Sequence, residues 1–189
     1  MRHCFVVLLL AVAACKGASR PPYASGYLGD YSQMKPSPRY ANQWGWQRPD
    51  ADFASYDRLI IDAVLINLIK DSPGRSLDQD LLRRTAESLR EGLVASIEPY
   101  YDVVKTGGAH TLRLQVVLTD VTPAAPGRDA GIAVECEAAD AVTGSKLVTA
   151  VSRLEWPYEE GAPALDPKRM EASYAEWARR IVHFLDSSR

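Results

Sequence analysis

Two histidines and one cysteine beyond residue 15 are the side chains best suited to chemistry: His110, His183 and Cys136. Imidazole and thiolate groups serve as bases, nucleophiles and metal ligands. No second cysteine or histidine stands at metal-ligand spacing from either histidine, so we expect surface histidines and no metal site. Cys136 occupies an inward position of an alternating stretch, where apolar surroundings raise the pKa of a thiol. We therefore predict that it is inert.

Glu135 and Glu137 flank that cysteine at the spacing of two carboxylates on one face of a strand. Paired carboxylates catalyse acid–base chemistry when their pKa values differ, but we expect both to be solvated, with Arg113 or Arg153 forming ordinary surface pairs. The sequence contains no GxSxG, P-loop or GxGxxG motif, and residues 141–146 (AVTGSK) lack phosphate-loop spacing. We predict no catalytic residue and no cofactor.

The N-terminus has the three parts of a secretory signal: the basic head Met1–His3, the apolar run Cys4–Val12, and the small residues Ala13 and Ala14 before Cys15. The run is shorter than the roughly 20 apolar residues that span a bilayer. Residues 12–15 (VAAC) resemble the bacterial lipobox. The resemblance implies removal of residues 1–14 and lipidation of Cys15. The alternative is an ordinary signal with an incidental cysteine.

A lipidated Cys15 places the protein in the bacterial envelope, because several acyl chains on one residue anchor it durably. Lys16 follows the cysteine, which by the usual sorting rule favours the outer membrane and a domain facing the periplasm. Cys136 then has no partner within the chain, so no disulfide is expected. The net charge of −2 excludes the basic footprint of a nucleic-acid-binding protein.

Residues 15–52 are rich in proline, glycine and aromatic side chains and show no helical or strand period. This composition predicts a tether between the membrane and a domain at 53–189. Disordered linkers are poor in aromatics, so we expect part of the tether to pack on the domain, with Trp44 and Trp46 as anchors. A strip that binds a partner protein is the alternative.

The domain begins with an apolar stretch at 56–69, which is typical of a strand buried on both faces. Ser76 and Gln79 form a capping box, and apolar residues at every fourth position then predict a helix ending near Tyr100. A short strand at 101–104 follows.

Residues 110–121, 131–140 and 146–156 alternate between apolar and polar, which predicts an antiparallel meander of three strands. Asp166 and Pro167 begin a second amphipathic helix. The order is strand, helix, four strands, helix. It predicts an α+β two-layer sandwich, with a mostly antiparallel sheet of about five strands and both helices on one face.

Four stretches, at 25–34, 49–64, 140–151 and 173–185, together resemble a family of bacterial lipoproteins catalogued as domain-of-unknown-function 3313. The resemblance covers nearly all of the chain after Cys15. It implies a lipid-anchored envelope protein of no established biochemical activity, and it supplies no catalytic residue.

These observations favour a non-catalytic binding or assembly module. Its expected partners are the membrane, through Cys15, and an envelope protein, with no nucleic acid and no small-molecule substrate. The candidate surfaces are the polar face of the sheet and the aromatic tether. The alternative is a periplasmic hydrolase whose site is assembled from distant residues.

Overall fold

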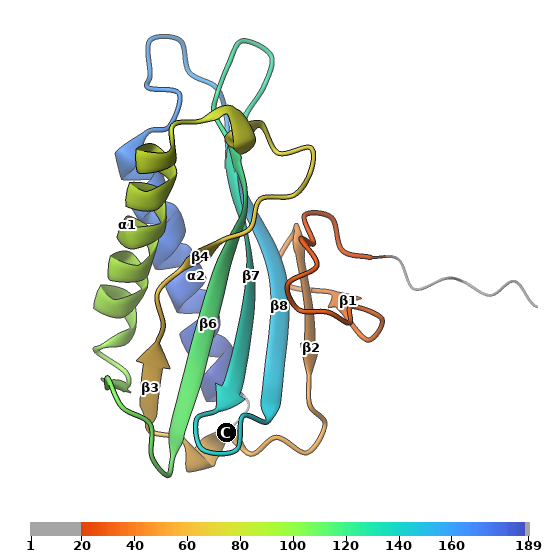
Figure 1. Ribbon diagram of the computed structural model, residues 1–189, viewed down its shortest axis with the longest axis vertical. Coiled ribbons are helices and arrows are strands. Elements are labelled where there is room, and N and C mark those ends of the chain that lie inside the picture. The colour runs from red at the N-terminus through yellow and green to blue at the C-terminus, as the bar shows by residue number, and fades with distance from the viewer. Residues whose placement is uncertain (1–19, 188–189) are drawn as a thin grey trace, which may run out of the picture.

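The computed structural model describes residues 20–187 and has an α+β fold (Figure 1). Two helices cover one face of a mixed, mostly antiparallel sheet, which confirms the predicted fold class. The sheet has eight strands, ordered β1-β2-β8-β7-β6-β3-β5, with β4 pairing separately with β6. It is therefore larger than the predicted sheet of about five strands.

The three long strands form the centre of the sheet: β6 (Thr111–Thr122), β7 (Ala130–Asp140) and β8 (Lys146–Trp156). They pair antiparallel as the alternating pattern predicts. Val116 lies opposite Cys136, and Cys136 lies opposite Ala150, so these side chains share the inner face that the helices cover.

The apolar stretch at 56–69 forms two short strands, which corrects the prediction of one long buried strand. These are β3 (Arg58–Ile61) and β4 (Leu65–Ile66), and both run parallel to β6. Ile61 lies opposite Leu114, and Leu65 lies opposite Val117. Between these two pairs the chain from β3 to β4 advances by four residues, whereas β6 advances by three. The extra residue interrupts the pairing with β6 between β3 and β4, as in a bulge, and both side chains of β4 are exposed. Strand β5 (Asp102–Val103) pairs parallel with β3.

Two further strands come from the proline- and aromatic-rich region, where the sequence shows no strand period. Strands β1 (Lys35–Pro36) and β2 (Gln43–Gln47) form a hairpin, and β2 pairs antiparallel with β8. Trp44 lies opposite Val151. These strands, with β4, account for the larger sheet.

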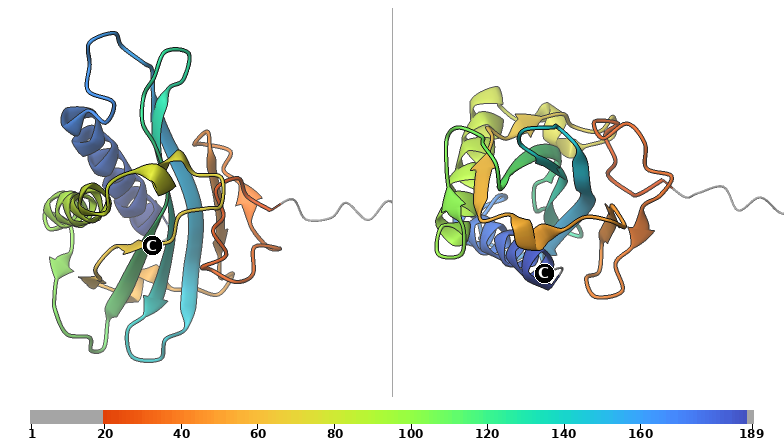
Figure 2. Two further views of the ribbon diagram at one scale, coloured as in Figure 1. Left: turned by 45° about the horizontal axis from the view of Figure 1, so that its top comes forward. Right: turned by 90° about the horizontal axis from the view of Figure 1, so that it is seen from below.

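Both helices pack on the inner face of the sheet (Figure 2). Helix α1 (Gln79–Ile97) is capped by Asp78, whose side chain accepts a hydrogen bond from Leu81 N at 3.0 Å. The predicted cap, Ser76, ends the 3₁₀ helix η2 (Pro73–Ser76) instead, so the start of the helix moves by two residues. Helix α2 (Pro167–Ser187) begins at the predicted Asp-Pro pair, and Asp166 Oδ1 accepts from Lys168 N at 2.9 Å.

The outer face of the sheet carries an irregular layer that the sequence pattern does not predict. Residues 20–34, here called the N-terminal segment, lie across this face on the side opposite the helices (Figure 2, left). Leu28, Tyr31 and Met34 form a second, smaller core with Val151 of β8. Just after the hairpin, the 3₁₀ helix η1 (Phe53–Ser55) buries Phe53 in the main core.

Candidate functional site

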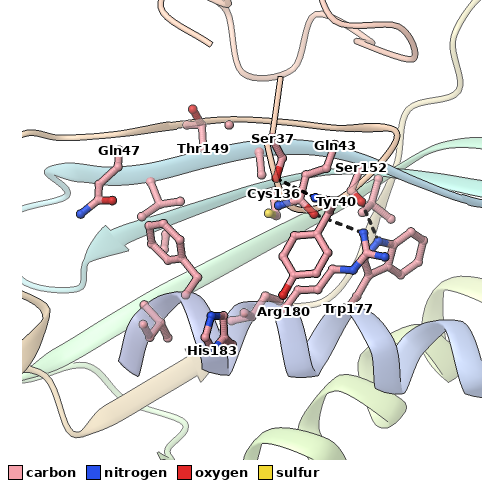
Figure 3. A pocket seen from close by; sticks show the side chains of 18 of the residues that line it. Ser37, Tyr40, Gln43, Gln47, Cys136, Thr149, Ser152, Trp177, Arg180 and His183 are labelled. Carbon is pink, nitrogen blue, oxygen red and sulfur yellow. Dashed lines mark hydrogen bonds between the residues drawn. The ribbon is translucent and has the colours of Figure 1, made fainter. Parts of the chain in front are cut away.

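A cavity of about 430 Å³ lies between the inner face of the sheet and helix α2 (Figure 3). This volume falls within the range of about 300–1,000 Å³ that is usual for small-molecule sites. Most of its wall is apolar. The aliphatic and aromatic lining comprises Pro36, Pro38, Tyr40, Trp46, Leu59, Leu89, Leu93, Leu114, Val116, Val134, Ala138, Val148, Ala150, Trp177, Ile181, Phe184 and Leu185.

The β1–β2 hairpin and the C-terminal half of α2 form the opening of the cavity, because all the exposed lining residues belong to these two elements. Figure 3 shows Tyr40 of the hairpin facing Arg180 and Trp177 of α2. The Arg180 guanidinium lies 4.4 Å from the centre of the Tyr40 ring, and Arg39 lies 5.6 Å from it. The Arg180–Tyr40 cation–π contact holds the hairpin against the helix, whereas the Arg39–Tyr40 contact lies within the hairpin.

Arg180 is positioned by hydrogen bonds at both ends of its guanidinium group. Its Nη1 donates to Gln43 Oε1 at 3.2 Å, and its Nε donates to Glu176 Oε1 at 2.8 Å. Only 13% of the side chain is exposed. The arginine therefore presents a fixed positive charge at the opening.

Cys136 contributes its thiol to the cavity wall, beside the buried pair in which Trp177 Nε1 donates to Ser152 Oγ at 3.0 Å. Burial raises the pKa of the Cys136 thiol to about 12. A thiol with such a pKa forms little thiolate at neutral pH and is a poor nucleophile.

The structure separates the two histidines. His183 lies at the opening and its Nε2 accepts a hydrogen bond from Arg39 Nη1. His110 lies at the start of β6 with a positive φ of 61°, and its Nδ1 is 2.6 Å from Ser55 O. Both side chains are exposed.

Glu135 is fully buried on the outer face, so the prediction of a solvated carboxylate is wrong. The N-terminal segment covers it and supplies its hydrogen-bond donors. Tyr31 Oη donates at 2.7 Å, Leu28 N donates at 3.2 Å, and Ser25 N also donates. A buried carboxylate with several donors satisfies the usual requirement for burying a charge, which indicates a structural role.

Glu137, two residues along β7, lies half-buried and pairs with Lys146 at 2.7 Å. Lys146 Nζ also donates to Leu28 O at 3.4 Å, and Leu28 N donates to Glu135. The two glutamates are therefore linked through Lys146 and the backbone of Leu28.

Arg153 is also buried, with 6% of its side chain exposed, which corrects the prediction of an ordinary surface pair. It forms an ion pair with Asp120, and its Nη2 donates to Thr122 Oγ1 at 3.1 Å. Its guanidinium stacks 4.5 Å from the ring centre of Tyr23 in the N-terminal segment. Arg113, by contrast, forms an exposed pair with Asp62 at 2.8 Å.

Within residues 20–187, no three His, Cys, Asp or Glu side chains gather as a candidate metal site. Neither helix in that range is long and apolar enough to cross a membrane. Cys15 and the predicted signal peptide at 1–14 lie outside the described residues.

The comparisons with known proteins found no match among curated proteins. Solved structures that are similar to this chain include the following three. A PelC dodecamer from Paraburkholderia phytofirmans is 11% identical, with a TM-score of 0.47 over 76% of this chain and 95% of that one. The hypothetical protein CT253 from Chlamydia trachomatis is 7% identical, with a TM-score of 0.48 over 69% and 98%. Lipoprotein GNA1162 from Neisseria meningitidis is 10% identical, with a TM-score of 0.36 over 67% and 98%.

A family model described as "Protein of unknown function (DUF3313)" matches residues 23–131, which is more than half of the chain. The matched region runs from the N-terminal segment through α1 and β6 into the start of β7. It includes the hairpin at the opening of the cavity. The chain therefore belongs to the DUF3313 family, as its resemblance to that family predicts.

Proposed function

We propose that this protein is a lipoprotein of the bacterial envelope, anchored through Cys15 in the outer membrane, whose periplasmic domain binds a ligand or partner without converting it. Residues 12–15 support the anchor, because small residues before a cysteine are the pattern of a lipidation site. Removal of residues 1–14 would leave the N-terminal segment a few residues from the membrane.

The chemistry of the cavity is the observation that supports the binding role. Its wall is mainly aliphatic and aromatic, and the thiol that it contains has a pKa raised to about 12 by burial. A wall of this kind excludes water and favours apolar groups, while a few placed polar groups orient what enters. These properties favour a binding site over a site of hydrolysis.

The anchor is tested by mass spectrometry of the purified protein and by membrane fractionation. We expect the wild-type N-terminus to be Cys15 carrying acyl chains, and we expect Cys15→Ala to remain an unacylated precursor. Cys4→Ala is the matched control, because it removes a cysteine from the same apolar region and should leave processing unchanged. An unacylated wild-type terminus, or one that begins elsewhere, would refute the anchor.

The binding role is tested by crosslinking in intact envelopes, followed by purification of the wild-type protein. We expect one defined envelope protein or one bound lipid to be recovered. Ester or glycoside hydrolysis by the purified protein would instead favour the hydrolase alternative.

A further inference from the structure

The cavity is created by a row of small side chains that crosses the inner face of the sheet. Strand pairing aligns Gly45 with Ala150, Ala150 with Cys136, and Cys136 with Val116. All four line the cavity. The row runs across β2, β8, β7 and β6 and leaves space between the sheet and α2, which core leucines also line.

The opening of this space is positively charged. Lys35, Arg39 and Arg180 line the cavity, and among residues 20–185, whose side chains the structure describes, no aspartate or glutamate does so. Glu176 pairs with Arg180 Nε from outside the lining, so the charges that border the space remain positive overall. Arg and Lys groups beside an apolar space are complementary to an anion that carries an apolar chain.

We propose that the cavity holds the hydrocarbon chain of an anionic amphiphile, with its negatively charged headgroup at Arg39 and Arg180. A fatty-acid carboxylate and a phospholipid phosphate share this chemistry. The proposal rests on the binding role proposed above and names its ligand class. It differs from the sequence-based expectation of no small-molecule substrate.

A fluorescent polyene fatty acid, cis-parinaric acid, tests the proposal. Trp177 lines the cavity, so energy transfer from its indole to the polyene reports entry. The chain from residue 15 onward, carrying Cys15→Ser, is used, since it lacks both the lipidation site and the apolar run Cys4–Val12, which could itself bind the probe. We expect saturable binding of one molecule per chain, and weaker binding of the uncharged methyl ester.

Two pairs of variants test whether the probe binds in this cavity with its carboxylate at Arg180. Ala150→Phe fills the middle of the row and should abolish binding, whereas Ala95→Phe on the exposed face of α1 should not. Arg180→Gln should weaken binding of the acid about tenfold, the usual effect of losing a hydrogen bond to a charged group. Arg179→Gln is the control, because it removes the same charge from the next residue, which is exposed and pairs with the same Glu176.

Unchanged binding in a folded Ala150→Phe variant would overturn the proposal. So would equal affinity for acid and ester together with an unaffected Arg180→Gln variant, a result that does not depend on the folding of Ala150→Phe. Displacement of the probe by oleate alone identifies a free fatty acid as the ligand, and displacement by phosphatidylglycerol vesicles identifies a phospholipid. The anchor is tested separately at Cys15, so an unacylated terminus would leave this binding result standing.

Discussion

Cys136 is a reactive residue type placed where its reactivity is suppressed. Its thiol lies on the inner face of β7, and burial raises its pKa to about 12 from an ordinary value of 9.0. Such a shift reduces the thiolate at pH 8 by roughly a thousandfold. We expect iodoacetamide to alkylate Cys136 far more slowly in the folded chain than in urea, as measured by peptide mass spectrometry. Equal rates in both states would show that the thiol is accessible and ionised.

Gly131 is the residue that allows Arg153 to lie flat on the sheet. A Cβ atom at position 131 would stand 2.5 Å from Arg153 Nη2 and 2.8 Å from its Cζ. The guanidinium has little freedom to move, because Asp120, Thr122 and Glu155 all bind it. We expect Gly131→Ala to lower the free energy of unfolding by about 1–3 kcal/mol, the usual cost of overpacking.

Urea denaturation measures this change. Gly108→Ala is the matched control, because a Cβ there meets no atom within 4 Å. A Gly131→Ala variant as stable as the Gly108→Ala variant would show that Arg153 is free to move.

Tyr31 makes the free energy of unfolding depend on pH in the alkaline range. Burial, followed by the hydrogen bond to Glu135, raises the pKa of Tyr31 to about 12. The unfolded chain releases this proton near pH 10, while the folded chain retains it. Above pH 10 the unfolded state therefore binds fewer protons, and the free energy of unfolding falls until the folded pKa is passed.

We expect Tyr31→Phe to make this alkaline slope shallower and to cost about 1–3 kcal/mol at neutral pH, since Glu135 loses a buried donor. Tyr100→Phe, at a side chain that is 63% exposed, is the control and should change neither quantity. Urea titrations at several pH values measure both. An unaltered slope in Tyr31→Phe would assign the effect to another tyrosine.

At the scale of elements, the structure and the sequence pattern place the N-cap of α1 at different residues. The pattern places the cap at Ser76, whereas the structure places it at Asp78, whose carboxylate accepts from Leu81 N. The Ser76 hydroxyl instead donates to Pro73 O at 2.8 Å. We expect Asp78→Ala to destabilise the protein by about 1 kcal/mol, the usual cost of a lost cap, and Ser76→Ala to cost less. The reverse order in thermal or urea unfolding would favour the sequence-based cap.

Elements with a long hydrophobic period are the ones that the sequence predicts well. Strands β7 and β8 and helix α2 each have eleven or more residues of clear alternation or helical spacing, and their predicted starts agree with the structure to within a residue. Strands β1, β2 and β4 have two to five residues and form only because a partner strand is already in place. No local pattern marks β1 or β2, whereas β4 lies in the apolar stretch at 56–69, for which the sequence predicts one strand.

Side-chain environments were harder to predict than strand directions. Alternation predicts correctly that Glu135 faces away from the helices, but it carries no information about what covers that outer face. The cavity could not be predicted from the local sequence pattern either. Its row of small side chains joins Gly45 to Ala150, which are about a hundred positions apart in the chain, and only the register of β2 against β8 brings them together.

At the scale of the whole molecule, residues 20–47 contribute to both faces of the sheet. The N-terminal segment covers the outer face through Glu135 and Arg153, and the hairpin closes the cavity against α2 through Tyr40 and Arg180. The sheet ends on each side in a strand of two residues, β1 and β5. Short edge strands disfavour pairing with other chains. The hairpin therefore extends the core sheet, and its short edge strand β1 disfavours further pairing on that side.

This arrangement predicts that β2 unfolds together with the domain, although it lies within the region 15–52 that the sequence marks as a tether. Strand β2 pairs with β8 along five residues, and Arg48 N donates to Leu147 O at 2.8 Å just beyond it. Elements that open only through global unfolding share one exchange free energy. We expect peptides covering 43–48 and 146–156 to exchange amide hydrogen with the same protection, and Trp44→Ala to lower both equally. Near-complete exchange of 43–48 within seconds, with 146–156 still protected, would show instead that the hairpin opens independently and that the cavity is open on that side for much of the time.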